Sequence, residues 1–364
     1  MVLAIILVLL VIGSVLFHFL SPWYLTPIAS NWGFIDDTLT ITFIVCGFVF
    51  VVINLFLAYC VYRFRYSKDR RAEYEPENKR LEWWLTAFTT VGVVAMLAPG
   101  LFVWAKYVDV PEEASLVEAV GKQWSWSYRY PGEDGILGTV DVRHIDAKNP
   151  FGMNPDDPNG QDDVLVSGSE FHLPLGDPVK VLLRSKDVLH DFYVPQIRAK
   201  MDLVPGMITY FWFTPTLAGT YDVLCAELCG SGHYNMRSRM VLEDEADFRA
   251  WLATQPTFAD TQTVQVATVS GSPEEQGRQI AESQGCMGCH SIDGSPGVGP
   301  TWKELAGRTE ELADGSAVIV DDAYLVESIV APNATIVAGY PPIMPAYQLD
   351  DAQLAALIAY LNSL

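Results

Sequence analysis

Two cysteines, a histidine and a methionine stand within twelve positions, from Cys225 through Cys229 and His233 to Met236, and a further histidine, His190, precedes them. Thiolate, thioether and imidazole are soft ligands that suit copper, whereas methionine is a poor ligand for zinc. A mononuclear electron-transfer copper uses one cysteine beside histidine and methionine, so the second cysteine needs its own explanation. It indicates either two thiolates that bridge two copper ions or a structural disulfide, and a disulfide would not require the histidines or the methionine.

The segment Cys225-Ala-Glu-Leu-Cys229-Gly-Ser-Gly-His233-Tyr-Asn-Met236 resembles the dinuclear copper (Cu-A) loop of subunit II of the haem-copper oxidases. The resemblance implies a cupredoxin-like domain that accepts electrons from cytochrome c. It also implies that the side chain of Glu227 reaches a magnesium or manganese ion shared with subunit I; the alternative is a loop residue of which only the carbonyl matters. The ligands that the family places around its copper pair fall on His190, Cys225, the carbonyl of Glu227, Cys229, His233 and Met236.

A second redox motif, Cys286-Met-Gly-Cys289-His290, is the attachment signature of a c-type haem. Its thiols add to the vinyl groups and its histidine becomes an axial ligand. Together with Gly299-Pro-Thr-Trp302, Pro342-Ile-Met344-Pro and a helical ending, the motif resembles a class I cytochrome c. The resemblance implies Met344 as the second axial ligand; the alternative is a hydrophobic loop residue, which would leave the flanking prolines unexplained. Histidine and methionine ligation raises the haem potential, which suits a respiratory carrier.

Three apolar runs, at residues 2–20, about 40–62 and about 83–105, each approach the roughly 20 residues that a membrane-spanning helix needs. The first run lacks a basic leader and a small-residue cleavage motif, so it is interpreted as a retained helix rather than a signal peptide. Seven lysines and arginines lie between the ends of the second and third runs. Positive loops stay in the cytoplasm. We therefore expect a multi-pass protein of the bacterial inner membrane, with everything after about residue 107 on its outer face.

The formal charge of −21 belongs to the part outside the membrane, because residues 1–110 hold eight basic and eight acidic residues. From Pro273 to the end there are thirteen acidic and three basic residues. An acidic surface attracts basic partners and repels nucleic acid. We interpret it as a docking surface for a basic soluble cytochrome; simple solubility is the alternative.

Short strands are predicted between the membrane runs and the haem motif. Residues 118–130 alternate aromatic and polar side chains with a period of two, which is typical of a strand. Several short strands separated by turns favour a Greek-key sandwich or barrel. The expected architecture is a multidomain membrane protein: a transmembrane α-helical anchor over 1–111, an all-β cupredoxin-like domain over 112–253, a linker over 254–272 and an all-α cytochrome c domain over 273–364. Further strands are predicted at 179–183, 209–213, 219–224 and 240–242.

Two other residues gain roles from the resemblance. Trp124 matches the tryptophan above the copper pair at which electrons enter, whereas Trp126 and Tyr128 are also explained as core residues. Glu82 matches a glutamate at the mouth of a proton-uptake channel; a favourable interaction with the helix dipole is the alternative. Met207 departs from the family, in which arginine is common at this position.

The resemblances together imply the electron-accepting subunit, subunit II, of a caa-type cytochrome c oxidase. Electrons would pass from a donor to haem c, to Cu-A and to a haem in subunit I, where oxygen is reduced to water with proton translocation. The expected partners are subunit I, other oxidase subunits, membrane lipid and a donor such as a basic cytochrome c or a cytochrome bc-type complex. No nucleic acid partner and no catalytic residue in this chain are expected. Two alternatives remain: a subunit of a Cu-A-containing nitric oxide reductase, and a membrane-tethered carrier without a catalytic partner.

Overall fold

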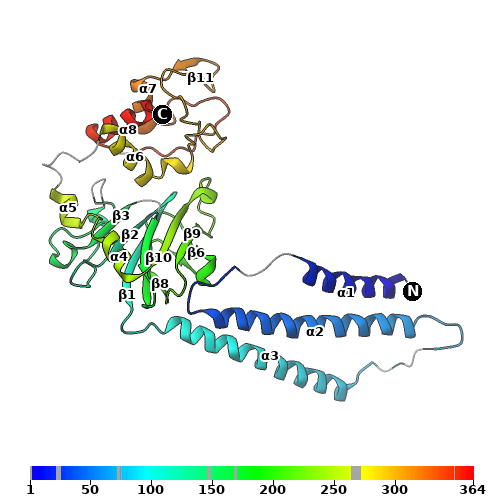
Figure 1. Cartoon of the computed structure of the whole chain (residues 1–364). Helices are drawn as coiled ribbons and strands as arrows, with labels where there is room; N and C mark the ends of the chain where they lie inside the picture. Colours follow the sequence, from blue (N-terminus) through cyan, green and yellow to red (C-terminus); the bar gives the residue numbers. More distant parts are fainter. Residues whose placement is uncertain are drawn as a thin grey trace. The chain divides into compact units, whose positions relative to one another are not determined.

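The computed structural model describes residues 2–21, 26–71, 74, 76–145, 149–167, 170–263, 272–347 and 349–364. The chain divides into two compact units. One contains Met1–Ile28 and Trp32–Asp109, and the other contains Ala29–Asn31 and Val110–Leu364. The predicted order of three apolar helices, a β-sheet domain and a C-terminal helical domain is present (Figure 1).

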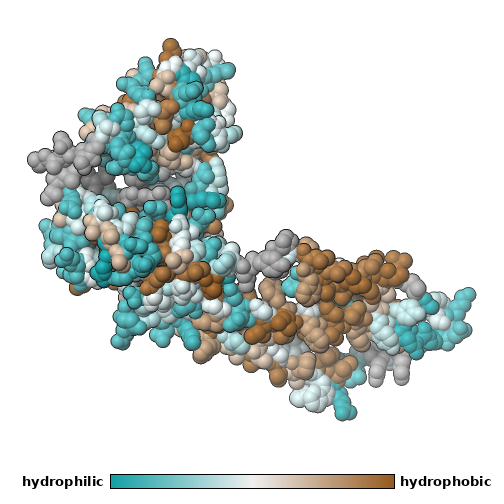
Figure 2. All heavy atoms as spheres, in the orientation of Figure 1, coloured by the Kyte–Doolittle hydropathy of each residue, from teal (hydrophilic) through white to brown (hydrophobic). Residues whose placement is uncertain are grey.

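Three long helices form the first unit: α1 (Val2–Leu20), α2 (Gly33–Arg63) and α3 (Lys79–Val108). By length and composition, each could cross a membrane. Their apolar side chains face outward, as the brown surface of Figure 2 shows, and a surface of this kind is stable only in lipid or against partner proteins. α2 and α3 begin earlier than predicted; the Asn78 side chain caps α3 by accepting from Leu81 N at 3.0 Å.

A short segment between α1 and α2 belongs to the second unit instead. Ala29 N donates to Gln196 O at 2.8 Å, and Ser30 pairs with Pro215 in an isolated bridge. Ala29 is fully buried. The prediction that residues 1–111 form one anchor is therefore wrong at Ala29–Asn31, because the backbone groups of these residues form hydrogen bonds with the second unit.

The described part of the β-domain contains two five-stranded sheets, with strand orders β3-β2-β1-β5-β8 and β4-β10-β9-β6-β7. Most neighbours are antiparallel, but β1 pairs with β5 and β10 pairs with β4 in parallel. Phe171, Phe192, Phe211 and Phe213 are fully buried in the core. The strands are β1 (Ser115–Lys122), β2 (Ser125–Tyr130), β3 (Val164–Ser167), β4 (Glu170–Pro174), β5 (Val179–Ser185), β6 (His190–Val194), β7 (Ala199–Leu203), β8 (Thr209–Phe213), β9 (Gly219–Cys225) and β10 (Arg237–Glu243).

The single strand predicted over residues 118–130 is wrong, because a tight turn at Gln123 and Trp124 divides it into β1 and β2. Both side chains of this turn donate to the carbonyl of Cys229, over 2.8 Å from Gln123 Nε2 and 3.1 Å from Trp124 Nε1. Trp126 and Tyr128, by contrast, lie in β2 and are buried in the core. The turn thus removes Trp124 from the core and places it at the end of the sandwich.

The linker predicted over residues 254–272 is wrong in its first part. Phe258 begins α5 (Phe258–Thr263), is fully buried, and packs with Val120, Phe151 and Leu165. Its backbone N–H donates to Asp163 O at 2.8 Å. The β-domain therefore continues through α4 (Glu245–Leu252) and α5, while residues 264–271 of the predicted linker lie outside the described residues.

The C-terminal domain consists of α6 (Pro273–Ser283), α7 (Asp322–Val330), α8 (Asp351–Asn362) and a small hairpin of β11 (Thr309–Glu311) and β12 (Ala317–Ile319). The helices predicted for this domain are present, and the small hairpin is an addition to them. α6 packs closely on α8 at Gly277, where a Cβ atom would lie 2.1 Å from Ala356 O. A shared core including Trp302, Leu325 and Leu357 holds the helices together.

Candidate copper centre and haem cavity

The predicted metal ligands meet at one end of the sandwich. His190 opens β6 and Cys225 closes β9, and these neighbouring antiparallel strands pair Phe192 with Cys225. The start of one strand and the end of the other therefore lie at the same edge. Cys225 N donates to Met236 O at 3.2 Å, which closes the intervening loop and brings its side chains back over that edge.

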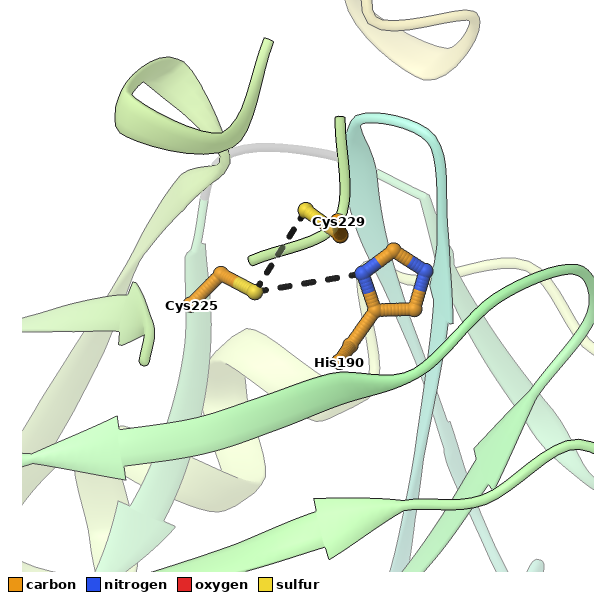
Figure 3. A group of neighbouring side chains, drawn as sticks. All are labelled: His190, Cys225 and Cys229. Atoms are coloured by element: carbon orange, nitrogen blue, oxygen red, sulfur yellow. Dashed lines mark hydrogen bonds between the residues drawn. The ribbon is translucent and has the colours of Figure 1, made fainter. Parts of the chain in front are cut away.

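The ligand atoms lie around the two sulfurs. Cys225 Sγ and Cys229 Sγ are 3.7 Å apart and both thiols are free, so the structure contains no disulfide there (Figure 3). The remaining contacts are Cys225 Sγ to His190 Nδ1 at 3.8 Å and to Glu227 O at 3.2 Å, and Cys229 Sγ to His233 Nδ1 at 3.6 Å and to Met236 Sδ at 3.9 Å.

These distances and donor types fit copper. Two ligands that each lie about 2.0–2.3 Å from one shared ion stand about 3.5 Å apart at tetrahedral angles. The donors are two sulfurs of cysteine, two imidazole nitrogens, a thioether and a carbonyl, which is a soft set apart from its one oxygen. His190, Cys229 and Met236 are buried, so water is largely excluded.

The two thiols differ electrostatically. Burial raises the pKa of Cys225, but hydrogen bonds from His190 and the backbone outweigh it, so that pKa is lowered. Burial and the neighbouring Cys225 raise the pKa of Cys229. One thiolate therefore forms readily and disfavours the second. Because a metal must bind both as thiolates, its uptake will release a proton.

Trp124 lies directly against this loop. Its indole N–H donates to Cys229 O, and its ring occupies the space that Gly232 leaves open. A Cβ atom at Gly232 would lie 2.3 Å from the ring. The structure thus brings Trp124 together with the predicted copper ligands.

Sequence reasoning missed Asp187, whose Oδ1 lies 2.8 Å from His190 Nε2. Its place three residues before His190, just after β5, was the available signal.

Cys286, Cys289, His290 and Met344 line a single cavity in the C-terminal domain, together with apolar side chains such as Ile329. His290 Nδ1 donates to Pro300 O over 2.7 Å, which fixes the ring and leaves Nε2 for an axial bond. Burial lowers the pKa of His290, so the neutral ring that can ligate iron is favoured. The donors and the apolar walls fit a covalently attached haem.

The other predicted residues lie elsewhere. Glu82 stands exposed in the first turn of α3, consistent with either interpretation of its role. Met207 is exposed between β7 and β8, where its N–H donates to Val204 O. The Glu227 carbonyl faces Cys225 Sγ, and the side chain of Glu227 is partly exposed.

Comparisons with known proteins assign the β-domain and the C-terminal domain to two different families. Residues 115–243 match the family described as cytochrome c oxidase subunit II, periplasmic domain, and residues 274–364 match cytochrome c. The alternative cytochrome c oxidase subunit 2 of Bradyrhizobium diazoefficiens is 62% identical over 71% of this chain and 94% of its own length. The cytochrome c oxidase subunit 2 of Alkalihalophilus pseudofirmus is 25% identical over 93% of this chain and 90% of its own. The solved periplasmic domain of subunit II of cytochrome oxidase (CoxB) of Bradyrhizobium japonicum is 26% identical, covering 40% of this chain and 96% of its own, with a TM-score of 0.30.

Three helices that could cross a membrane, a cupredoxin-like domain and a cytochrome c domain confirm the predicted architecture and define a membrane protein of electron transfer. The chain belongs to the cytochrome c oxidase subunit 2 family and carries a cytochrome c domain in addition. It is a subunit of a cytochrome c oxidase, an oxidoreductase, and its partners are other subunits of that oxidase. The family implies copper, and the cytochrome c domain implies haem.

Proposed function

We propose that this subunit carries electrons from an external donor through a covalent haem c and a dinuclear Cu-A centre to a haem in subunit I. The observation that carries the proposal is the pair of free thiols 3.7 Å apart, each flanked by an imidazole nitrogen at less than 4 Å. The bound groups would supply one-electron chemistry with little change in geometry. Oxygen reduction and proton translocation would take place through the partner subunit.

The residues of the chain have distinct parts in this proposal. His190, Cys225, Glu227 through its carbonyl, Cys229, His233 and Met236 would hold the two coppers. Cys286 and Cys289 would bind the haem covalently, with His290 and Met344 as axial ligands. His290 is oriented by its bond to Pro300, and Trp124 is bonded to the carbonyl of Cys229, so it is in contact with the backbone of a copper ligand.

Three finer assignments follow from the family resemblance. The Glu227 side chain would bind a magnesium or manganese ion shared with subunit I. Glu82 would lie at the start of a proton-uptake route. The three helices would anchor the chain in the bacterial inner membrane, with the copper and haem domains on the outer face; the basic loop between α2 and α3 supports this orientation.

Metal and haem analysis of the purified oxidase tests the proposal. We expect two coppers and one haem c in this subunit, and an electron paramagnetic resonance signal split by two copper nuclei. Cys225→Ser should remove this signal, while the matched control Cys46→Ser in α2 should keep it. A single copper, a zinc ion or a cystine at Cys225 and Cys229 would contradict the assignment.

Copper depletion tests the order of transfer. Haem c should remain reducible by the donor while oxygen consumption stops. Reduction of the subunit I haem at the normal rate without copper would exclude the copper pair from the route.

A further inference from the structure

Asp187 joins one predicted copper ligand to the turn that carries Trp124. Its Oδ1 lies 2.8 Å from His190 Nε2, and its Oδ2 accepts from the backbone N–H of Gln123 at 2.7 Å. Oδ1 also accepts from Val188 N at 2.7 Å, which holds the carboxylate in place. Both oxygens of Asp187 are thus used within the β-domain.

The geometry determines which nitrogen of His190 faces the sulfurs. Nδ1 points toward Cys225 Sγ, and Nε2 points toward the carboxylate. A carboxylate accepts only, so Nε2 must carry a proton, and in the neutral ring Nδ1 then has the lone pair that a metal binds. The neighbouring side chains pack the ring without fixing its tautomer; for example, Trp126 meets it edge-on at 6.3 Å between ring centres.

We propose that Asp187 is a positioning residue that aligns His190 and strengthens its Nδ1 as a copper ligand. This inference rests on the proposed copper centre. Asp187 also links two of the predicted ligands, His190 and Cys229. Gln123 donates to Asp187 through its backbone N–H and to Cys229 O through its side chain. Hydrogen bonds therefore link His190, Asp187, Gln123 and Cys229 in sequence, with Trp124 bonded to the same carbonyl.

The decisive experiment compares D187N with the unsubstituted oxidase, using histidine labelled with ¹⁵N. An amide keeps the size of the side chain but loses its charge and one of its two acceptor oxygens, so it cannot accept from both His190 Nε2 and Gln123 N. We expect D187N to retain two coppers, to change the hyperfine coupling of the His190 ring nitrogen and to lower copper affinity about 10–100-fold in competition with a chelator. The reduction potential should rise, because a neutral partner makes the imidazole a weaker donor.

The matched control is D222N, because Asp222 stands three residues before Cys225 as Asp187 stands three before His190, and it is exposed. It should leave coupling, affinity and potential unchanged. A D187N protein with only a lower melting temperature and unaltered nitrogen coupling would show a structural role and overturn the inference.

D187E decides the question if D187N does not fold. Moving the carboxylate by one methylene must alter the His190 coupling if the carboxylate holds the ring, and must leave it unaltered if it does not. Failure of the proposed function is a separate result, because the unsubstituted protein would then lack the copper pair altogether.

Discussion

Glu118, Arg129 and Asp163 form a charged cluster inside the sandwich. Arg129 bonds Glu118 and Asp163 at 2.9 Å each, and all three side chains are at most 3% exposed. Removing one partner from a buried ion pair leaves an uncompensated charge, which costs about 3–5 kcal/mol. We therefore expect Glu118→Gln to lower the free energy of unfolding of the β-domain by about that amount, measured by denaturant titration. Glu113→Gln, at an exposed position, should have no effect; equal stability of both variants would contradict the argument.

Asp163 should make the same domain sensitive to pH. Burial raises its pKa to about 6, against the opposing effect of Arg129. An unfolded aspartate has a pKa of about 3.9, so between these values the folded chain binds more protons than the unfolded chain. The free energy of unfolding should thus fall as pH rises from about 4 to about 6, and level off above. Asp163→Asn should flatten this slope in thermal unfolding; an unchanged slope would assign it to other groups.

At the scale of elements, the types and spacing of neighbouring residues predict some parts of the fold, whereas contacts between distant segments determine others. The copper loop lies within Cys225 to Met236, so its ligand types could be read from one segment. β6 was missed because His190 to Val194 is buried on nearly every side, which removes the alternation that marks a half-exposed strand. The Gln123–Trp124 turn was missed because its bonds go to Cys229, about a hundred positions away in sequence. Asp187 was missed for a similar reason, since one of its partners, Gln123, lies in the turn after β1, 64 positions earlier in the sequence.

The segment after α4 was also mispredicted, because its contacts lie far away in the sequence, and it supplies a test. Phe258 was predicted in a linker, but it is fully buried against Phe151 and Leu165. Truncating a buried phenylalanine to alanine costs about 3–5 kcal/mol. We expect Phe258→Ala to destabilise the β-domain by that amount without changing the melting of the cytochrome c domain, measured by calorimetry. Phe17→Ala, in the exposed apolar surface of α1, is the control; no effect of Phe258→Ala would restore the linker interpretation.

The close contact between α6 and α8 predicts that an added side-chain atom also destabilises the cytochrome c domain. A Cβ at Gly277 would meet the Ala356 carbonyl, which is backbone and cannot move aside easily. Overpacking of this kind costs about 1–3 kcal/mol, which outweighs the roughly 1 kcal/mol that alanine gains in helix propensity. Gly277→Ala should lower the melting temperature of that domain, while Gln279→Ala on the exposed side of α6 should not. A stabilised Gly277→Ala protein would contradict the close packing.

At the scale of the whole molecule, charge divides the chain into parts with different tasks. Residues 1–110 are neutral overall, which suits a membrane anchor, whereas the sequence from Pro273 onward holds thirteen acidic and three basic residues. A surface of one sign raises the rate of encounter with an oppositely charged partner, and salt screens it within about 10 Å at 0.1 M. Transfer between two centres of one chain needs no such encounter.

The two steps of electron delivery should therefore respond differently to salt. We expect reduction of haem c by a basic soluble cytochrome to slow by about tenfold as ionic strength rises from 0.01 to 0.2 M. Transfer from haem c onward to copper should keep its rate, because both centres belong to one chain. Stopped-flow spectroscopy resolves the two phases. Glu311→Lys, on the exposed face of the β11–β12 hairpin beside the cavity residue Glu310, should slow only the first phase, and Glu113→Lys near the start of the β-domain should slow neither. A first phase independent of salt would show that the acidic domain serves solubility and that the donor is not a basic protein.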